Sequence, residues 1–239
     1  MTDGKKRLVL LNSGGPDALL AGSILSENYS VHSLFVDYDQ HSAARERLCA
    51  QLCAEYLDAS HSELTLDVYR AHASAIGMIS GKGRSSSLNP ISEYVPFRNT
   101  LLLANAVALA ESLQASAVGI GSIAGPWVTP DNRPEYFEAL RELVNAGTLK
   151  TTSIDVETPL QELSKTRVID KCLDRELPLQ FTWSCHNSNT TPCQSCGNCD
   201  MRSTAFRELQ RSDPLMGDWP NGTAANGAAA AAYGAGKGS

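Results

Sequence analysis

Four cysteines near the end of the chain have a spacing that suits a metal ion. Cys185, Cys193, Cys196 and Cys199 follow the pattern C-x7-C-x2-C-x2-C. Cysteines two residues apart can wrap one tetrahedral ion, and four thiolates form a closed structural zinc site with no open position. An iron–sulfur cluster is the competing interpretation, because C-x2-C-x2-C runs also hold clusters. His186, beside Cys185, could replace one of the four ligands.

A glycine-rich loop near the start could bind a phosphate. Ser13, Gly14, Gly15, Pro16 and Asp17 follow a short apolar run and precede a helical pattern. Adjacent glycines let backbone N–H groups approach an anion, and the positive end of the next helix points at the same place. The Ser13 hydroxyl can donate to a phosphate oxygen, whereas Asp17 suits helix capping or a magnesium ion. The alternative is an ordinary strand-to-helix turn.

The elements that must position these residues alternate along the first part of the chain. Apolar runs at 8–11, 31–38 and 64–66 predict strands, and helices are predicted between them at 18–27 and 42–57. This alternation favours an α/β fold, a Rossmann-like parallel sheet with helices on both faces. Ligands bind such sheets at the carboxyl ends of the strands, where the glycine-rich loop lies.

The rest of the chain predicts further elements of the same kinds. Helices are expected at 98–112, 134–145 and 159–175, and short strands at 117–121 and 154–156. The helix at 98–112 is strongly apolar, so we expect it to be buried on most sides. Between 79 and 93 the chain is irregular, and a loop of that length is more often functional than idle.

Composition divides the chain into three expected parts. Residues 1–180 form the nucleotide-binding domain, 181–211 a small C-terminal zinc-binding segment with a terminal helix, and 212–239 a flexible tail rich in alanine and glycine. Cys49, Cys53 and Cys172 lie outside the cysteine cluster on helical faces, where core packing is the expected role.

Charge and hydropathy exclude some classes of protein. The 239 residues include 26 acidic and 20 basic side chains, which gives a net charge of −6. This charge argues against a protein that binds nucleic acid through overall positive charge. No apolar run approaches the roughly 20 residues that span a bilayer, and the polar start has no apolar signal core. We therefore expect a cytoplasmic protein without a membrane anchor.

Taken together, the motifs resemble those of a known family. The loop is similar to S-G-G-x-D-S, and the cysteine spacing to the C-terminal zinc signature, of the 7-cyano-7-deazaguanine synthases within the PP-loop ATP pyrophosphatases. Four other stretches match in the same order: 38–41 resembles Y-x-Q-[RH], 95–99 resembles V-P-G-R-N, 130–135 resembles P-D-C-R-x-E, and 158–165 resembles T-P-L-x-x-L-x-K. The resemblance runs from about residue 8 to residue 207.

The resemblance implies an ATP-dependent ligase that consumes ATP and releases AMP. A substrate carboxylate attacks the α-phosphate, and an amine then displaces AMP from the acyl-adenylate. In the family the acid is 7-carboxy-7-deazaguanine and the amine is ammonia, and a second ATP dehydrates the amide to a nitrile. The ATP-binding residues implied are Asn12, Ser13, Gly14, Gly15, Pro16, Asp17 and Ala18.

The resemblance also implies roles for side chains far from the loop. Asp17, Arg98 and Lys165 are the catalytic candidates, the two cations neutralising phosphate charge. The substrate-binding candidates are Gln40, Arg98, Asn99, Trp127, Asp131 and Arg133. Several of these residues also have a structural interpretation. Arg98 could be a surface charge at the start of a helix, and Lys165 a solvated helix residue. Asp131 could cap the helix that starts at 134, Arg133 could lie on the surface, and Trp127 could pack over the core.

The chain departs from the family pattern at several positions. Ala18 replaces a Ser or Thr, Phe97 replaces Gly, and Asn132 replaces Cys. The stretch 121–129 lacks the family's S-G-Y and the acidic residue before it. A carboxylate there could read a guanine-like edge, so the ATP half of the resemblance is better supported than the deazaguanine half.

These departures keep other functions open. A defence or secondary-metabolism enzyme could join the deazaguanine acyl group to another amine, such as a protein N-terminus. A PP-loop enzyme acting on tRNA is disfavoured by the acidic net charge. A catalytically inactive, zinc-containing partner protein would fit the changes at Ala18 and Phe97. A homodimer is the default expectation for such an enzyme.

Overall fold

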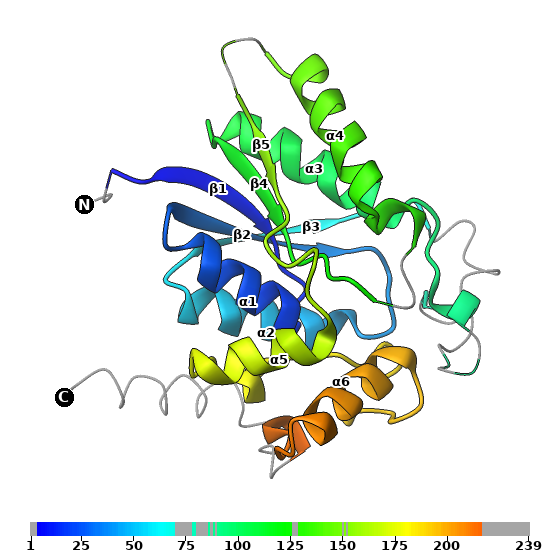
Figure 1. Ribbon diagram of the computed structural model, residues 1–239. Helices are drawn as coiled ribbons and strands as arrows, with labels where there is room; N and C mark the ends of the chain where they lie inside the picture. The colour runs from blue at the N-terminus through cyan, green and yellow to red at the C-terminus, as the bar shows by residue number, and fades with distance from the viewer. Residues whose placement is uncertain are drawn as a thin grey trace.

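The computed structural model describes residues 4–69, 78–79, 86, 88, 90–125, 129–149, 151 and 153–216. At its centre is a sheet of five strands (Figure 1): β1 (Lys6–Leu11), β2 (Tyr29–Asp37), β3 (Ser60–Thr65), β4 (Ala117–Ile120) and β5 (Asp155–Glu157). The strand order is β3-β2-β1-β4-β5, and every neighbouring pair is parallel. The predicted Rossmann-like parallel sheet is confirmed.

Strand β1 shows why both faces of the sheet are covered. Leu8 and Leu10 point into one apolar cluster, and Val9 and Leu11 point into another, so alternate side chains serve opposite faces. A strand buried on both faces reads as a continuous apolar run, which is how it is visible in the sequence.

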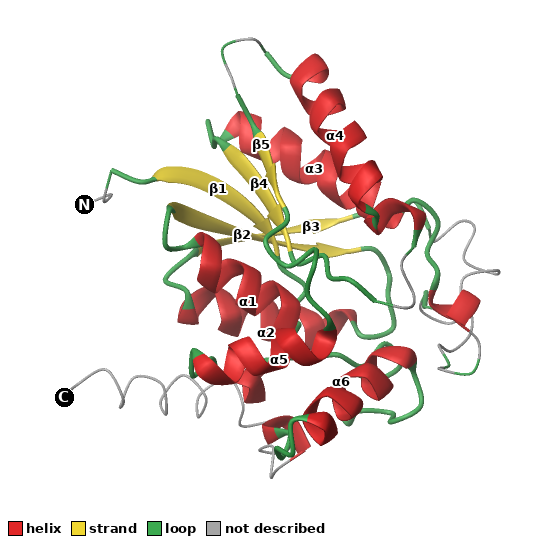
Figure 2. Ribbon diagram, in the orientation of Figure 1, coloured by secondary structure: helices red, strands yellow, loops and turns green. Residues whose placement is uncertain are grey.

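Helices lie on both sides of the sheet (Figure 2). One face carries α1 (Pro16–Leu25), α2 (Ala43–Tyr56), α5 (Lys165–Asp174) and α6 (Gly197–Glu208). The other carries α3 (Arg98–Ser112) and α4 (Pro134–Gly147). Four short 3-10 turns connect them: η2 (Pro90–Glu93), η3 (Pro130–Asn132), η4 (Leu179–Phe181) and η5 (Pro214–Met216).

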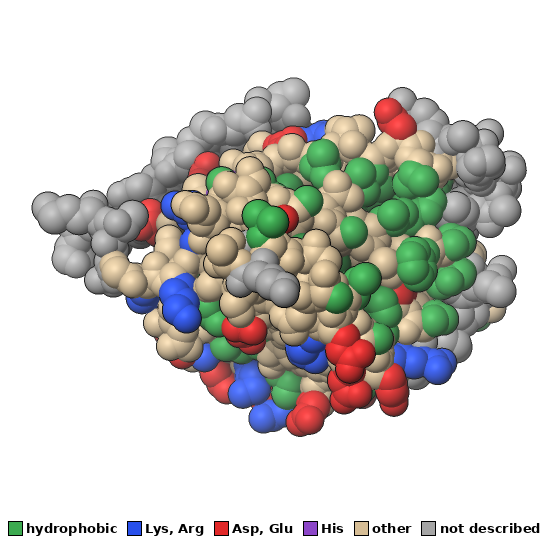
Figure 3. Space-filling view, turned by 90° about the horizontal axis from the view of Figure 1, so that it is seen from above, with side chains coloured by type: hydrophobic (Ala, Val, Ile, Leu, Met, Phe, Trp, Pro, Cys, Tyr) green, Lys and Arg blue, Asp and Glu red, His purple; other side chains and the backbone are tan. Residues whose placement is uncertain are grey.

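Helix α3 has the predicted bounds, but the expectation that it is buried on most sides is met only in part, because most of its residues are half-buried and one side is exposed. Asn99, Leu103, Ala106 and Ala110 form its buried face. Ala104 and Ala108 are exposed on the other side. Seen from above, hydrophobic side chains gather on one side of the molecular surface, and several acidic ones lie near its lower edge (Figure 3). The apolar composition of α3 therefore reflects small exposed alanines as well as burial.

Helix α5 begins later than the predicted start at 159. Residues 159–162 form turns, and the helix starts at Lys165. Ser164 is its N-cap, with the side-chain oxygen accepting from the Arg167 N–H at 3.3 Å. A serine cap supplies an acceptor that the first turn of a helix otherwise lacks, so it sets the start of α5.

The cysteine segment packs on the main domain. Ala205 and Phe206 of α6 join the apolar cluster that also holds residues of α1. Folded structure continues past the expected boundary at 211, because buried Arg202 pairs with Asp213 and Leu215 is buried. Residues 217–239, most of the expected tail, lie outside the described residues. In the described part of the chain, no helix is long and apolar enough to cross a membrane.

Candidate active site

A cavity of about 330 Å³ lies where β1 and β4 end. The strand order reverses at β1, with β2 on one side and β4 on the other, and open parallel sheets bind ligands at such a point. Ten predicted site residues line it: Asn12, Ser13, Gly15, Pro16, Asp17, Ala18, Gln40, Arg98, Asn99 and Lys165. The fold therefore brings together residues from the two halves of the chain.

The glycine-rich loop is held in shape by Asn12 and Gly14. The Asn12 side chain donates to the Ser33 hydroxyl and the Ala50 carbonyl at 3.0 Å, and accepts from the Gly14 N–H at 2.9 Å. Gly14 has a φ of +71°, and a Cβ there would lie 2.6 Å from the Ala50 nitrogen. Gly14 thus lets the loop lie against α2 and does not itself line the cavity.

The loop ends at an uncapped helix. Gly15 is the N-cap of α1, Pro16 follows at the first turn, and no side chain caps the helix. Ser13 is exposed into the cavity. The positive end of α1 is thereby left to an anion beside Ser13. The alternative role considered for Asp17, capping this helix, is not what the structure shows.

Asp17 and Lys165 form an ion pair across the cavity wall. The Lys165 Nζ lies 2.7 Å and 2.6 Å from the two carboxylate oxygens of Asp17. The lysine is the first residue of α5, and its side chain is only 10% exposed. Since an ammonium group has three donors, one N–H remains for a ligand. Both oxygens of Asp17, the residue that the sequence offered for a magnesium ion, are thus bonded to Lys165.

Arg98 is a cation within the cavity wall and not a surface charge. It begins α3 and lies beside the Tyr38 hydroxyl, with Asp131 and Glu46 nearby. Burial acts to lower the pKa of Arg98, but the field and hydrogen bond of Tyr38 and the two carboxylates outweigh it and raise that pKa. The guanidinium therefore stays charged where an anionic ligand would bind.

Asp131 lies behind the cavity wall. Its carboxylate accepts from the backbone N–H of Asn99 at 2.8 Å, and the Asn99 amide donates to the Asp131 carbonyl at 2.9 Å. Asp131 thus satisfies the first turn of α3 and not the helix at 134, which corrects its plainer interpretation. Arg133 is exposed outside the cavity. Trp127 lies outside the described residues.

Phe97 adopts a backbone conformation that suits the glycine found in the family pattern. Its φ is +57°, in the left-handed region, and its side chain is 61% exposed. It does not line the cavity. The departure at this position therefore costs backbone energy without filling the site.

Sequence reasoning missed carboxylates that line the cavity. Glu46 accepts from the Gln40 amide at 2.8 Å and from the Ser42 hydroxyl at 2.6 Å. Ser42 is the N-cap residue of α2, but its hydroxyl donates to Glu46 and makes no capping hydrogen bond to the backbone. The buried Gln40 side chain is part of this network, since its amide oxygen accepts a hydrogen bond from the Tyr38 backbone N–H. Glu93 also lines the cavity, and it ends the irregular 79–93 stretch whose length suggested a function. Glu46 had no sequence signal for a site, because it lies within an ordinary helical pattern.

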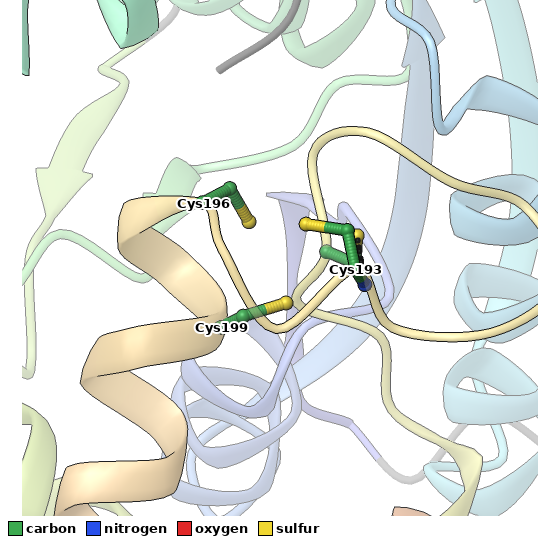
Figure 4. Close-up of side chains that lie close together, drawn as sticks. Cys193, Cys196 and Cys199 are labelled. Carbon is green, nitrogen blue, oxygen red and sulfur yellow. Dashed lines mark hydrogen bonds between the residues drawn. The ribbon is translucent and has the colours of Figure 1, made fainter. Parts of the chain in front are cut away.

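The sulfurs of Cys193, Cys196 and Cys199 point toward one another at the start of α6 (Figure 4). Cys185, Cys193, Cys196 and Cys199 each offer a sulfur within 4.8 Å of the others. Backbone N–H groups of Cys193 and Asn187 lie 3.3 and 3.4 Å from the Cys185 sulfur. Hydrogen bonds from the Cys196 and Cys199 thiols, then these N–H groups, lower the pKa of Cys185. This donor set fits a metal ion.

Comparison with known proteins shows the family. The model for "Queuosine biosynthesis protein QueC" matches residues 7–210. The chain belongs to the QueC family. A 7-cyano-7-deazaguanine synthase of Methanoculleus marisnigri is 36% identical over 221 residues, covering 88% of this chain and 98% of that one. One of Acidobacterium capsulatum is 35% identical over 228 residues, covering 90% and 98%.

Membership of the QueC family confirms the resemblance and the expected class, an ATP-dependent ligase-type enzyme. Among solved structures, an NMN synthetase of Francisella tularensis aligns with a TM-score of 0.45 and 13% identity, covering 88% of this chain and 79% of that one. That likeness is too distant to add to the family assignment.

Proposed function

We propose that this QueC-family enzyme uses ATP to activate the carboxylate of 7-carboxy-7-deazaguanine and joins it to ammonia. The named relatives are 7-cyano-7-deazaguanine synthases. The observation that carries the proposal is the cavity at the end of β1, where the 12–18 loop, Lys165 and Arg98 meet. The phosphates of ATP and the carboxylate of the substrate would lie together there, beside the Lys165 and Arg98 cations that both require.

In the proposed first step, a substrate carboxylate oxygen attacks the α-phosphorus of ATP and pyrophosphate leaves. Ser13 and the positive end of α1 would bind the pyrophosphate, and Lys165 and Arg98 would stabilise the negative charge that develops. Ammonia then attacks the acyl carbon, AMP leaves, and an amide forms. The amide oxygen then attacks the α-phosphorus of a second ATP, releasing pyrophosphate and a proton, and loss of AMP with a second proton yields the nitrile.

Zinc and magnesium are both proposed, and the structure supports them to different extents. The closed set of four buried or half-buried thiolates suits a structural zinc ion, which would fold the 185–199 segment and take no part in bond making. Magnesium is expected to arrive with ATP. Because Lys165 engages both oxygens of Asp17, we derive no step through that ion.

The proposal is tested by incubating the zinc-loaded protein with ATP and 7-carboxy-7-deazaguanine, with and without ammonia. AMP release that depends on the acid, and mass spectra showing amide and nitrile, are expected. An adduct formed only with a different amine, such as a peptide N-terminus, would contradict the ammonia step. Nucleotide binding without AMP release for any acid or amine would instead indicate a catalytically inactive partner protein.

A further inference from the structure

Glu93 is a carboxylate in the cavity wall that the proposed reaction does not use. It ends η2, lines the same cavity as the 12–18 loop, and its side chain is 17% exposed. His186 and Asn198 of the cysteine segment line the cavity beside it. A half-buried acid facing a ligand cavity needs either a structural partner or a ligand with donors.

The cysteine segment holds Glu93 in place through Gly197. The Gly197 N–H, at the positive end of α6, donates to Oε1 of Glu93. A Cβ on Gly197 would lie 2.8 Å from Oε2, so the close approach requires glycine. The His186 Nδ1 lies 3.5 Å from Oε2, longer than an ordinary hydrogen bond. Donors therefore face both carboxylate oxygens, and because each oxygen has two lone pairs the carboxylate retains acceptor capacity toward the cavity that it lines.

The other carboxylates that line the described part of the cavity are each held by side-chain donors at 2.6–2.8 Å. Asp17 gives both oxygens to Lys165, and Glu46 accepts from Gln40 and Ser42. The stretch 121–129, where the family pattern has an acidic residue, has none. Glu93 differs in that its one hydrogen bond within ordinary distance comes from a backbone N–H, with the nearest side-chain donor, His186, at 3.5 Å.

A metal ion is a weaker explanation for this arrangement. Glu93, His186 and Cys196 offer ligand atoms within 4.8 Å of one another. Cys196, however, also belongs to the four-cysteine set, which is complete without the other two. A carboxylate accepts hydrogen bonds only, and a pair of neighbouring N–H donors can bond both of its oxygens.

We propose that Glu93 recognises the acid substrate by accepting hydrogen bonds from adjacent ring N–H and exocyclic amino groups. The inference rests on the proposed function, because a 2-amino-6-oxo ring carries this donor pair and the acid named above contains such a ring. The cysteine segment then has a second role: its Gly197 N–H positions the carboxylate that selects the ring.

The test compares two acids with the intact, zinc-loaded enzyme: 7-carboxy-7-deazaguanine and its analogue without the exocyclic amino group. Wild-type kcat/KM for AMP release should favour the amino-bearing acid. Glu93→Gln should lower kcat/KM for that acid by about 10- to 100-fold, mainly through KM, and lower it far less for the analogue. Glu138→Gln, an exposed carboxylate on α4 outside the family motifs, is the matched control and should change neither value.

Gly197→Ala supplies a second variant, because its added Cβ would displace the Glu93 carboxylate without removing it. It should also raise KM for the amino-bearing acid while zinc content stays at the wild-type value. Equal losses for both acids in Glu93→Gln, or loss of zinc from that variant, would overturn the recognition role. No acid-dependent AMP release from wild type with either acid would instead overturn the proposed function and, with it, this role.

Discussion

Lys165 reaches the nucleotide loop only because α5 starts beside it. Its Nζ bonds both oxygens of Asp17, which fixes the ammonium group at the edge of the cavity. The side chain loses rotamer freedom in the fold and not during the reaction, so the charge is positioned in advance. The pair thereby orients a cation toward the place where phosphate charge would develop.

Substituting either member of this pair should remove turnover without unfolding the protein. We expect Asp17→Ala and Lys165→Met to lower acid-dependent AMP release by at least about 100-fold, as loss of a positioned charge does in other enzymes. Zinc content measured on the same samples should not change, because the cysteine cluster does not contact either side chain. Retained activity in Asp17→Ala would show that the loop has another role.

Phe97 predicts the opposite kind of effect, a gain in stability. A bulky residue at a φ of +57° costs roughly 1–2 kcal/mol that glycine avoids. Because the side chain is exposed and outside the cavity, Phe97→Gly should raise the free energy of unfolding by about 1 kcal/mol. Chemical denaturation measures this, and AMP release should be unchanged. A loss of stability would mean that the Phe97 ring makes contacts worth more than the strain.

At the scale of elements, the loop between β1 and α1 depends on contact with α2. Gly14 lies against the α2 backbone, whereas a Cβ on Gly15 would meet its nearest atoms at 3.4 Å, an ordinary contact. The two neighbouring glycines therefore have different requirements.

Gly14→Ala and Gly15→Ala make a matched pair of variants. We expect Gly14→Ala to lose at least about 2 kcal/mol of stability, from left-handed strain and from the clash with α2. Gly15→Ala should keep nearly the full stability, so any loss of ATP affinity there reports on the loop itself. Thermal unfolding measures the first effect and nucleotide titration the second. Equal stability of the two variants would contradict this geometry.

Most elements were predictable because their signals are local. The apolar run of β1 and the start and end of α3 are visible in the residues themselves. The start of α5 was predicted too early, because an apolar pattern continues upstream of the Ser164 cap. The role of Asp131 was unpredictable for another reason: it bonds Asn99, 32 residues away, and only the fold brings them together.

The site shows the same division between local and distant information. Motifs located the loop, the cysteines, Arg98 and Lys165. They did not predict that Lys165 pairs with Asp17 over 148 residues, or that Glu93 meets the start of α6, since neither contact has a spacing rule. The expected homodimer stays a prediction.

At the scale of the whole molecule, the cysteine segment is joined to the active site. The Trp183 backbone N–H donates to the Gly14 carbonyl at 2.8 Å. The guanidinium carbon of Arg45, on α2, lies over the Trp183 ring, 5.0 Å from its centroid. The segment thus supports the back of the nucleotide loop as well as Glu93. Loss of the metal should therefore loosen the site as well as the segment.

We expect about one zinc per chain, and Cys193→Ser to lose it together with stability, since binding of a structural metal is coupled to folding. Elemental analysis and thermal unfolding measure this. Thr191→Ala, an exposed neighbour, is the control and should keep both. A folded, fully stable protein without metal would contradict the assignment, and iron with visible absorbance would indicate a cluster instead.

The central claim is that the cavity at the end of β1 holds ATP so that an acid attacks its α-phosphorus. Exchange of labelled pyrophosphate into ATP measures that step directly, because it needs a reversible adenylate and no amine. We expect exchange that requires 7-carboxy-7-deazaguanine and is lost in Lys165→Met. Zinc-loaded, folded enzyme that binds ATP yet shows no acid-dependent exchange and no AMP release would contradict it.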